Sequence, residues 1–239
     1  MKLSRLQLAR TYQAVNFAYP FRRWNLIKQD ADFLSDSYRT AWGSWHRGID
    51  LNGVGGGATD LGMVIQSMFP GEVVGVEAQS GWGQVVLVRS DDWVRQLASY
   101  ILGFELETLD VQYAHLEQRS VELGYRLNAG DHLGSLGGGD KNLDWRSVYR
   151  SYVPHLHLEM RFKKVPTIVH QKGASRQSVL EQCLNPNTVL DRFKFSSRGN
   201  TVDTRRRVLP VRLADTPTGV SFEKLLITNV VDDKFYLRF

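Results

Sequence analysis

Between residues 42 and 162, short apolar runs alternate with polar residues and are separated by glycine. Examples are residues 71–76, 84–89 and 111–116. This alternation, with β-branched residues and glycine-rich turns, is typical of antiparallel strands joined by tight connections. We therefore predict a mainly β fold that is built on an antiparallel sheet.

Two stretches outside this pattern favour helix. Residues 93–102 read as a short amphipathic helix inserted between two strands, and residues 3–15 have loose helical spacing. After Pro20 the pattern breaks up, and an irregular lead-in is expected that packs on the core. Its aromatic residues are expected to fill the core rather than to form a ligand platform.

The end of the chain predicts a connector and a small extension. Residues 163–190 look like a connector that closes the domain, and the last fifty residues read as a few strands. The arginines at 205–207 are more typical of a solvated edge than of a binding patch. The expected organisation is a lead-in at 1–41, a main domain at 42–190 and a C-terminal β extension or accessory lobe at 191–239.

Composition narrows the classes of function. The 239 residues are 42% hydrophobic and 23% charged, so a disordered chain is excluded as the default. The net charge of +5 suits an acidic polymer such as a cell wall, but it is too small to indicate nucleic acid. Cys183 is the single cysteine, which rules out an intrachain disulfide and a cysteine-based zinc cluster.

No signal for export or membrane insertion is visible. Residues 1–10 lack the apolar run of a secretory signal, and no stretch is long and apolar enough to span a bilayer. A trimmed leader, another export route and action from inside the cell all remain open.

Two histidines in one apolar run carry the candidate chemistry. His155 and His157 are two residues apart, so on a strand they project from the same face while the intervening leucine faces the core. Glu159 continues this face and is a candidate to orient a metal ligand. Zinc needs at least three protein ligands, so the pair needs further donors.

A second stretch supplies those donors. His46 and Asp50 are four residues apart, with Gly48 between them. Together with His157 they would make an N,N,O site whose fourth position stays open for water or a carbonyl, as in catalytic zinc sites. His115 lies in another β-like run and is expected to reach the same cleft, where it and His155 would handle protons and stabilise an oxyanion.

The motifs around these residues resemble those of the lysostaphin/LytM-type zinc metallopeptidases. The resemblance covers roughly residues 42–162 and is carried by His46-x-Gly48-x-Asp50, Tyr113-Ala114-His115-Leu116, the turn at 124–134, and His155-x-His157. Glycine-led hairpins at 70–74 and 81–86 and the dipeptide Asn185-Pro186 also match the family's pattern.

The resemblance implies a peptidoglycan endopeptidase with the duplicated hybrid motif fold, a barrel-sandwich hybrid. It implies one Zn²⁺ held by His46, Asp50 and His157, and it alone chooses His157 over His155 as the ligand. His115 and His155 become the catalytic histidines. The expected partner is a peptidoglycan peptide, at the cell envelope in the periplasm or outside the cell, with no nucleic acid.

Several features leave alternatives open. Insertions at 54–61, 90–109 and 140–150 surround the expected groove, and four residues are candidates to line it: Asp140, Trp145, Tyr149 and Tyr152. His132 is expected to be structural and His170 to lie on the surface. The rival functions are a non-cleaving wall-binding or amidase-activator module, and a wall-degrading component of a phage particle or secretion apparatus. The oligomeric state is not indicated.

Overall fold

The computed structural model describes residues 2–79, 81–137, 153–169 and 173–196, and the backbone alone at 230–231 and 234–235. These residues form a ten-stranded sheet with short helices around it, so the prediction of a mainly antiparallel β fold is confirmed. The elements are, in order, α1 (Arg5–Ala14), β1 (Phe17–Ala18), η1 (Trp24–Leu26), β2 (Ile27–Ala31), α2 (Asp36–Trp42), β3 (Gly48–Gly53), β4 (Val64–Gln66), β5 (Gly71–Gln79), β6 (Gly83–Ser90), α3 (Asp92–Leu102), β7 (Asp110–Arg119), β8 (Arg126–Leu127), β9 (His132–Leu136), β10 (Leu156–Arg161), α5 (Arg176–Leu180), β11 (Cys183–Leu184), α6 (Pro186–Arg192), β12 (Phe195–Ser196), β13 (Val230–Val231) and β14 (Lys234–Phe235).

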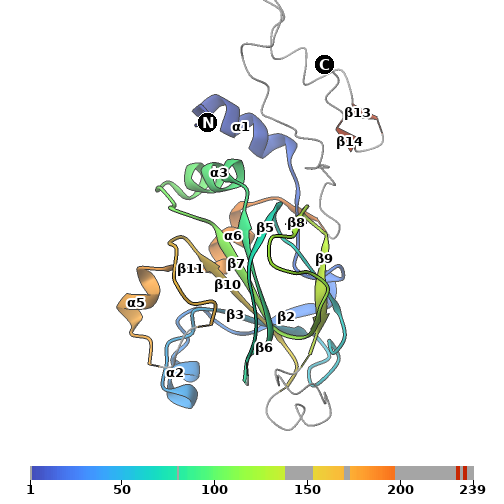
Figure 1. Cartoon of the computed structure of the whole chain (residues 1–239), viewed down its shortest axis with the longest axis vertical. Helices are drawn as coiled ribbons and strands as arrows, with labels where there is room; N and C mark the ends of the chain where they lie inside the picture. Colours follow the sequence, from blue (N-terminus) through green and yellow to red (C-terminus); the bar gives the residue numbers. More distant parts are fainter. Residues whose placement is uncertain are drawn as a thin grey trace, which may run out of the picture.

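The sheet brings distant parts of the chain side by side. Its strands lie in the order β2-β3-β10-β7-β6-β5-β8, and β9 pairs with both β4 and β7. All of these pairings are antiparallel. Strand β10 lies between β3 and β7, so the three stretches that carry the candidate residues become neighbours (Figure 1).

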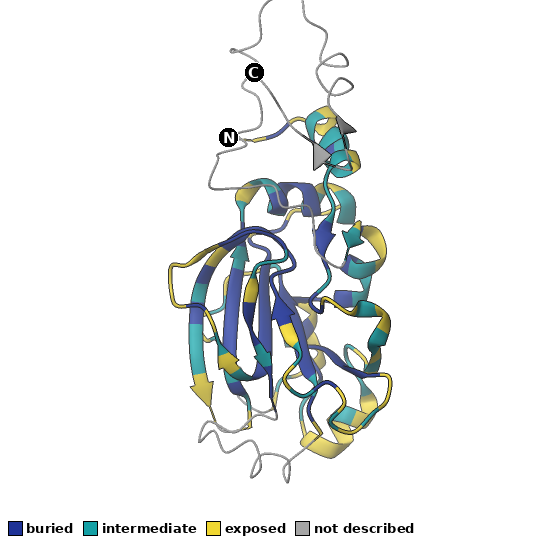
Figure 2. Ribbon diagram, turned by 90° about the vertical axis from the view of Figure 1, so that its right-hand side faces the viewer, coloured by how far each residue is buried: buried dark blue, intermediate teal, exposed yellow. Residues whose placement is uncertain are grey.

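Strands β3 and β10 present an apolar face and a polar face. Leu156 pairs with Leu51 and Leu158 with Ile49, and all four side chains are buried in the main core. Burial of such a side chain contributes roughly 1.5–3 kcal/mol, so this face offsets the cost of desolvating the polar side chains on the other. Figure 2 shows the central strands buried along their length, with exposed residues gathered on helices and connections.

The predicted inserted helix is confirmed as α3, between β6 and β7. Val94, Leu97 and Ala98 form its buried face. Helix α1, also predicted, begins at a Ser4 capping box and packs against α3. The two helices lie together at one end of the sheet, and α2 lies at the other end (Figure 1).

The expectation of an irregular lead-in after Pro20 is wrong. The segment contains η1, strand β2, which extends the sheet beside β3, and helix α2. Strand β2 was hard to predict because it is an edge strand whose inward positions are only half-buried. Helix α2 had signals at both ends, the Ser35 cap and Gly43 in the left-handed conformation. The lead-in aromatics do fill the core as expected, with Phe17 and Phe21 fully buried.

The connector after β10 contains α5, β11 and α6. Strand β11 pairs with β10, and α6 is capped by Asn185 and begins at Pro186. Strand β12 pairs in parallel with β1, near the start of the chain. Beyond it, β13 and β14 form an antiparallel pair, and the arginines at 205–207 lie outside the described residues. No helix among the described residues is long and apolar enough to cross a bilayer.

Candidate metal centre

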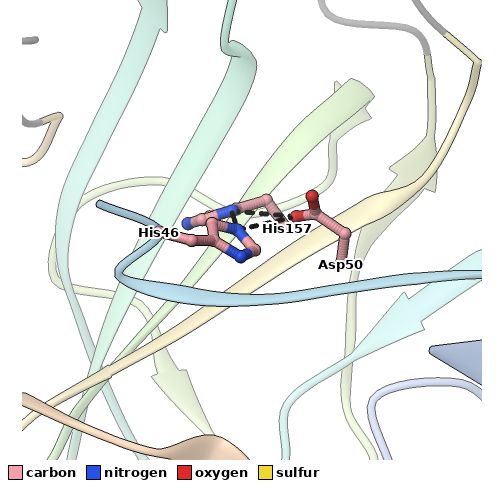
Figure 3. Close-up of side chains that lie close together, drawn as sticks. All are labelled: His46, Asp50 and His157. Carbon is pink, nitrogen blue, oxygen red and sulfur yellow. Dashed lines mark hydrogen bonds and ion pairs between the residues drawn. The ribbon is translucent and has the colours of Figure 1, made fainter. Parts of the chain in front are cut away.

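Pairing of β3 with β10 places two of the predicted metal ligands opposite each other. Asp50 and His157 are cross-strand partners, and His157 also pairs with Ala114 of β7. His46 precedes β3 by two residues, and its ring reaches back to the same point (Figure 3). Within the described part of the chain, these three buried residues form the group that could hold a metal ion.

The three donor atoms form a nearly equilateral triangle. His46 Nε2 lies 3.1 Å from Asp50 Oδ1 and 3.0 Å from His157 Nδ1, and His157 Nδ1 lies 3.1 Å from the same oxygen. Zinc–ligand distances of about 2.0–2.1 Å separate tetrahedral ligands by about 3.3–3.4 Å. The observed spacing is close to this value, so the residues fit a zinc ion in size and donor type.

The contacts behind each ring indicate which nitrogens carry protons. His46 Nδ1 lies 2.8 Å from the carbonyl oxygen of Asp32, which can only accept, so neutral His46 presents a lone pair at Nε2. His157 Nε2 lies 3.6 Å from a Glu159 carboxylate oxygen, which favours the proton on that nitrogen and leaves the Nδ1 lone pair for the centre. With the Asp50 carboxylate, three lone pairs converge. Such an arrangement needs a cation or a proton between them.

The charges support the same interpretation. Burial tends to raise the pKa of Asp50, but hydrogen bonds with His157 and His46 outweigh it and hold this pKa well below its ordinary value. Burial tends to lower the pKa of His157, but the carboxylates of Asp50 and Glu159 raise it to about 9. The metal-free centre therefore holds a proton beside an ionised carboxylate, and a divalent cation would take the place of that proton.

A backbone irregularity brings His115 to the centre. Between the pairs Val86–Tyr113 and Gln84–Leu116, β7 has one residue more than β6, which is a β-bulge. His115 has φ 66° there, and its amide donates to the Trp82 carbonyl at 2.8 Å. Strict alternation would point His115 away from the face that carries Ala114. The bulge instead places its ring 4.6 Å from that of His155, centroid to centroid.

The two predicted catalytic histidines differ in environment. His115 is buried, and this burial, with the charges of His155 and His157, holds its pKa well below its ordinary value. His155 is more open, with 18% of its side chain exposed. Its Nδ1 lies 2.7 Å from the Val153 carbonyl, so Nε2 presents a lone pair in the neutral ring, 3.7 Å from Asp50 Oδ1.

Two aromatic residues at the centre were missed by sequence reasoning. Tyr38 of α2 stacks on His46 with ring centroids 4.2 Å apart, and burial together with the carboxylates of Asp50 and Glu159 raises its pKa to about 12. Trp82, at the β5–β6 turn, stacks on His115 at 5.8 Å and meets His157 edge-on at 5.3 Å. Tyr38 lay in a segment expected to be irregular. Trp82 lies in the hairpin expected at 81–86, and its position beside His115 depends on the bulge.

His132 stands apart from the candidate metal group. His132 is exposed, its Nε2 lies 2.8 Å from the Gly134 carbonyl, and it is not one of the three residues of the candidate metal group. His170 and the four groove candidates lie outside the described residues, and these four are Asp140, Trp145, Tyr149 and Tyr152.

Comparison with known proteins gives likeness of structure alone. No family model and no curated protein matches the chain. A chain of the SpoIIQ–SpoIIIAH pore-forming complex matches with 19% identity and a TM-score of 0.48, over 82% of this chain and 98% of that one. Lysostaphin of Staphylococcus simulans matches with 16% identity and a TM-score of 0.47, over 74% and 53%. The catalytic domain of the prophage-encoded M23 protein EnpA of Enterococcus faecalis matches with 21% identity and a TM-score of 0.43, over 73% and 95%.

The solved structures that this chain resembles thus include LytM- and lysostaphin-type peptidases. At these identities and TM-scores, nothing about the activity, substrate or partners of this chain follows from them.

Proposed function

We propose that this chain is a zinc-dependent endopeptidase that hydrolyses peptide bonds of bacterial peptidoglycan. The observation that carries the proposal is the convergence of His46 Nε2, Asp50 Oδ1 and His157 Nδ1 within 3.1 Å of one another. Two further histidines stand beside them without belonging to the triangle. A three-donor site with neighbouring proton carriers is the arrangement that metal-assisted hydrolysis needs.

The three ligands and the two histidines have separate tasks. When bound, zinc would polarise the scissile carbonyl and make a water molecule acidic enough to lose a proton near neutral pH. His155 Nε2 faces the centre with a lone pair, so it is placed to accept that proton and to pass it to the leaving amine. No covalent intermediate with the protein is needed.

His115 acts from the buried side. Its low pKa keeps the ring neutral, and its stacking on Trp82 fixes the plane of the imidazole. A neutral ring held in this way can donate a hydrogen bond to the oxyanion that develops on the scissile carbonyl. Tyr38 holds the His46 ring from α2 by stacking.

The choice of peptidoglycan rests on the sequence motifs and on charge. The order of the His-x-Gly-x-Asp, Tyr-Ala-His-Leu and His-x-His elements resembles that of wall endopeptidases, and the net charge of +5 suits an acidic wall polymer. The proposed place of action is therefore the cell envelope, with zinc as the cofactor and a wall peptide as the substrate.

The test is release of new amino groups from purified sacculi. The zinc-loaded protein is expected to release them, and a chelator is expected to abolish the release. His115→Ala is expected to lower the rate by about 10²–10⁴-fold while leaving zinc stoichiometry at one, since it removes a hydrogen-bonding group of the reaction and no ligand. His132→Ala is the matched control, because His132 is exposed and not part of the metal group.

The contradicting results are distinct. Wild-type protein that takes up no zinc, or that takes up zinc and releases no amines from either glycyl-bridged or directly cross-linked sacculi, would refute the endopeptidase. Wall pelleting without amine release would favour a non-cleaving module. Co-purification with a phage particle or a secretion complex would place the same activity in such an assembly.

A further inference from the structure

Strand β10 carries further polar side chains on the face that holds His157. His157, Glu159 and Arg161 alternate along it, so their side chains project to the same side. Every residue of this strand is buried. The strand therefore carries a ligand, a carboxylate and a guanidinium in succession into the interior.

Arg161 is a fully buried cation whose donors are directed at fixed acceptors. Its side chain is 0% exposed. Nε donates to Glu159 Oε1 at 2.6 Å, and Nη1 donates to the carbonyl of Thr167 at 2.9 Å. Nη2 donates to the carbonyl of Ile168 at 2.5 Å and to Gln112 Oε1. A planar guanidinium with acceptors on several sides has one orientation, which a lysine in its place could not reproduce.

Glu159 lies between this cation and the metal ligand. One of its oxygens accepts from Arg161, and the other lies 3.6 Å from His157 Nε2. The cross-strand partner of Glu159 is Gly48, whose missing side chain lets the two strands approach closely. Carboxylates behind a ligating histidine fix its tautomer and its ring orientation.

We propose that Arg161 is a positioning residue of the metal centre, which holds Glu159 behind His157 so that the His157 Nδ1 lone pair faces the metal. This proposal rests on the proposed zinc site. The arginine is tied to the backbone at Thr167 and Ile168, so the position of the carboxylate is set by the segment that follows β10. The His157 ring is thereby anchored from behind, through two side chains, to a part of the chain that does not touch the metal.

A role in stability alone explains the pair less well. Desolvation of two charges largely cancels their attraction, so a buried ion pair contributes little net stability compared with apolar residues of similar size. Orientation of a metal ligand, by contrast, is served directly by an acceptor at the position that Glu159 occupies, and a carboxylate is one of the common choices.

The experiment compares zinc affinity, measured by chelator competition, with thermal stability of the metal-free protein. Glu159→Gln keeps the shape of the side chain but removes its charge. The new amide can turn an N–H toward His157 Nε2, which favours the tautomer with its proton on Nδ1, the atom that would bind zinc. Arg161→Lys keeps the positive charge but loses the planar set of donors that the guanidinium directs at several acceptors. Both are expected to weaken zinc binding about 10–100-fold and to shift the visible absorption bands of the cobalt-loaded protein.

Arg89→Lys is the matched control. Arg89 also forms a close ion pair, with two contacts to Asp110 at 2.8 and 2.7 Å, and its hydrogen bonds go to Asp110 and Thr108, away from Glu159. Its side chain is 36% exposed, so its replacement is expected to lower stability less than Arg161→Lys does. Zinc affinity is expected to change by less than about twofold, because the replacement removes no acceptor behind a ligand.

Three results would overturn the inference. The first is a folded Glu159→Gln variant whose zinc affinity and cobalt spectrum are unchanged. The second is a loss of zinc affinity in Arg89→Lys as large as that in Arg161→Lys. The third is failure of Glu159→Gln to fold, which would make the pair a requirement of folding. If Arg161→Lys does not fold, Glu159→Gln decides. Absence of zinc uptake by the wild type would instead refute the proposed function, so the two failures are distinguishable.

Discussion

His115 shows how a single backbone conformation can bring a side chain to a site. With φ 66° in the left-handed region, a residue other than glycine pays about 1–2 kcal/mol. The conformation persists because the neighbouring backbone holds it on both sides, through hydrogen bonds to the Trp82 carbonyl and from the Gly137 amide. The cost is consistent with a side chain that is needed at this position for more than packing.

This strain can be measured by comparing two replacements. In an ordinary strand alanine is more stable than glycine, but at position 115 we expect His115→Gly to be more stable than His115→Ala by about 1 kcal/mol. Urea unfolding of both variants gives the difference directly. A more stable alanine variant would show that the left-handed conformation is not present in solution.

Asp60 is a buried carboxyl group away from the metal centre. It is fully buried in the turn that follows β3. Burial raises its pKa to about 6, and nearby amides of Asp60 and Gly53 offset this only in part. Because the folded pKa lies above the unfolded value, the folded state binds the proton more tightly, and the contribution of Asp60 to stability falls as pH rises from about 4 to about 6.

Asp60→Asn should therefore stabilise the protein in a pH-dependent way. The variant is expected to melt above the wild type at pH 7.5, where the wild type buries a charge, and the difference should shrink toward pH 4.5, where the carboxyl is protonated in the fold. Melting curves across this range test it, with exposed Asp191→Asn as the control. A difference that does not vary with pH would contradict the assignment.

At the scale of elements, the close approach of β3 and β10 brings the three candidate ligands together. Gly48 pairs with Glu159, and a Cβ at position 48 would lie 2.2 Å from the Leu158 carbonyl oxygen. Real Cβ atoms do not approach a backbone oxygen so closely, so a side chain here must push the strands apart. Since Asp50 and His157 are cross-strand partners two residues further on, the displacement would reach the metal centre.

Gly48→Ala is accordingly expected to cost about 3 kcal/mol or more, within the range of severe core changes, and to weaken zinc binding. Gly43→Ala provides the comparison. Gly43 has φ 69° at the end of α2, but a Cβ there meets nothing within 4 Å, so its replacement should cost only about 1 kcal/mol and leave zinc affinity unchanged. Equal effects in the two variants would show that strand contact does not control the site.

Much of the sheet could be predicted from the sequence, whereas parts of the site could not. Strands β5, β6 and β7 are short runs rich in β-branched and other apolar residues, and α3 shows a helical stripe, so pattern alone identified them. Edge strand β2 and helix α2 were missed because their side chains are mostly half-buried or exposed, which weakens the periodic signal. Tyr38 was missed with them.

The candidate ligands were predictable in kind but not in arrangement. Spacing put His155 and His157 on one face, yet nothing in the sequence fixed that His157 pairs with Asp50 or that a bulge turns His115 around. These depend on register between strands far apart in the chain. The assignment of metal and catalytic roles to these residues remains a prediction.

For the molecule as a whole, the three candidate metal ligands come from segments that are far apart in the sequence. His46 and His157 are 111 residues apart, and a ligand that binds only the folded chain stabilises it by mass action. The N,N,O triangle is absent from an unfolded chain, so bound zinc would favour the fold and not its unfolded ensemble.

Zinc at about 100 times its dissociation constant is expected to stabilise the protein by about 2.7 kcal/mol, or roughly 5–10 °C in Tm for a domain of this size. Chelator should reverse the shift, and Asp50→Ala should not show it. Asp60→Asn, which leaves the ligands intact, should retain it. A shift of the same size in Asp50→Ala would mean that zinc binds elsewhere.

The first forty residues touch the metal centre from within the fold. The carbonyl of Asp32 accepts from His46 Nδ1, and the Tyr38 ring covers the face of the same imidazole. An inhibitory propeptide is discarded on maturation and leaves a working enzyme behind. Here, proteolytic loss of this segment would remove two contacts of His46, so it is expected to weaken metal binding at the candidate site rather than to activate the protein.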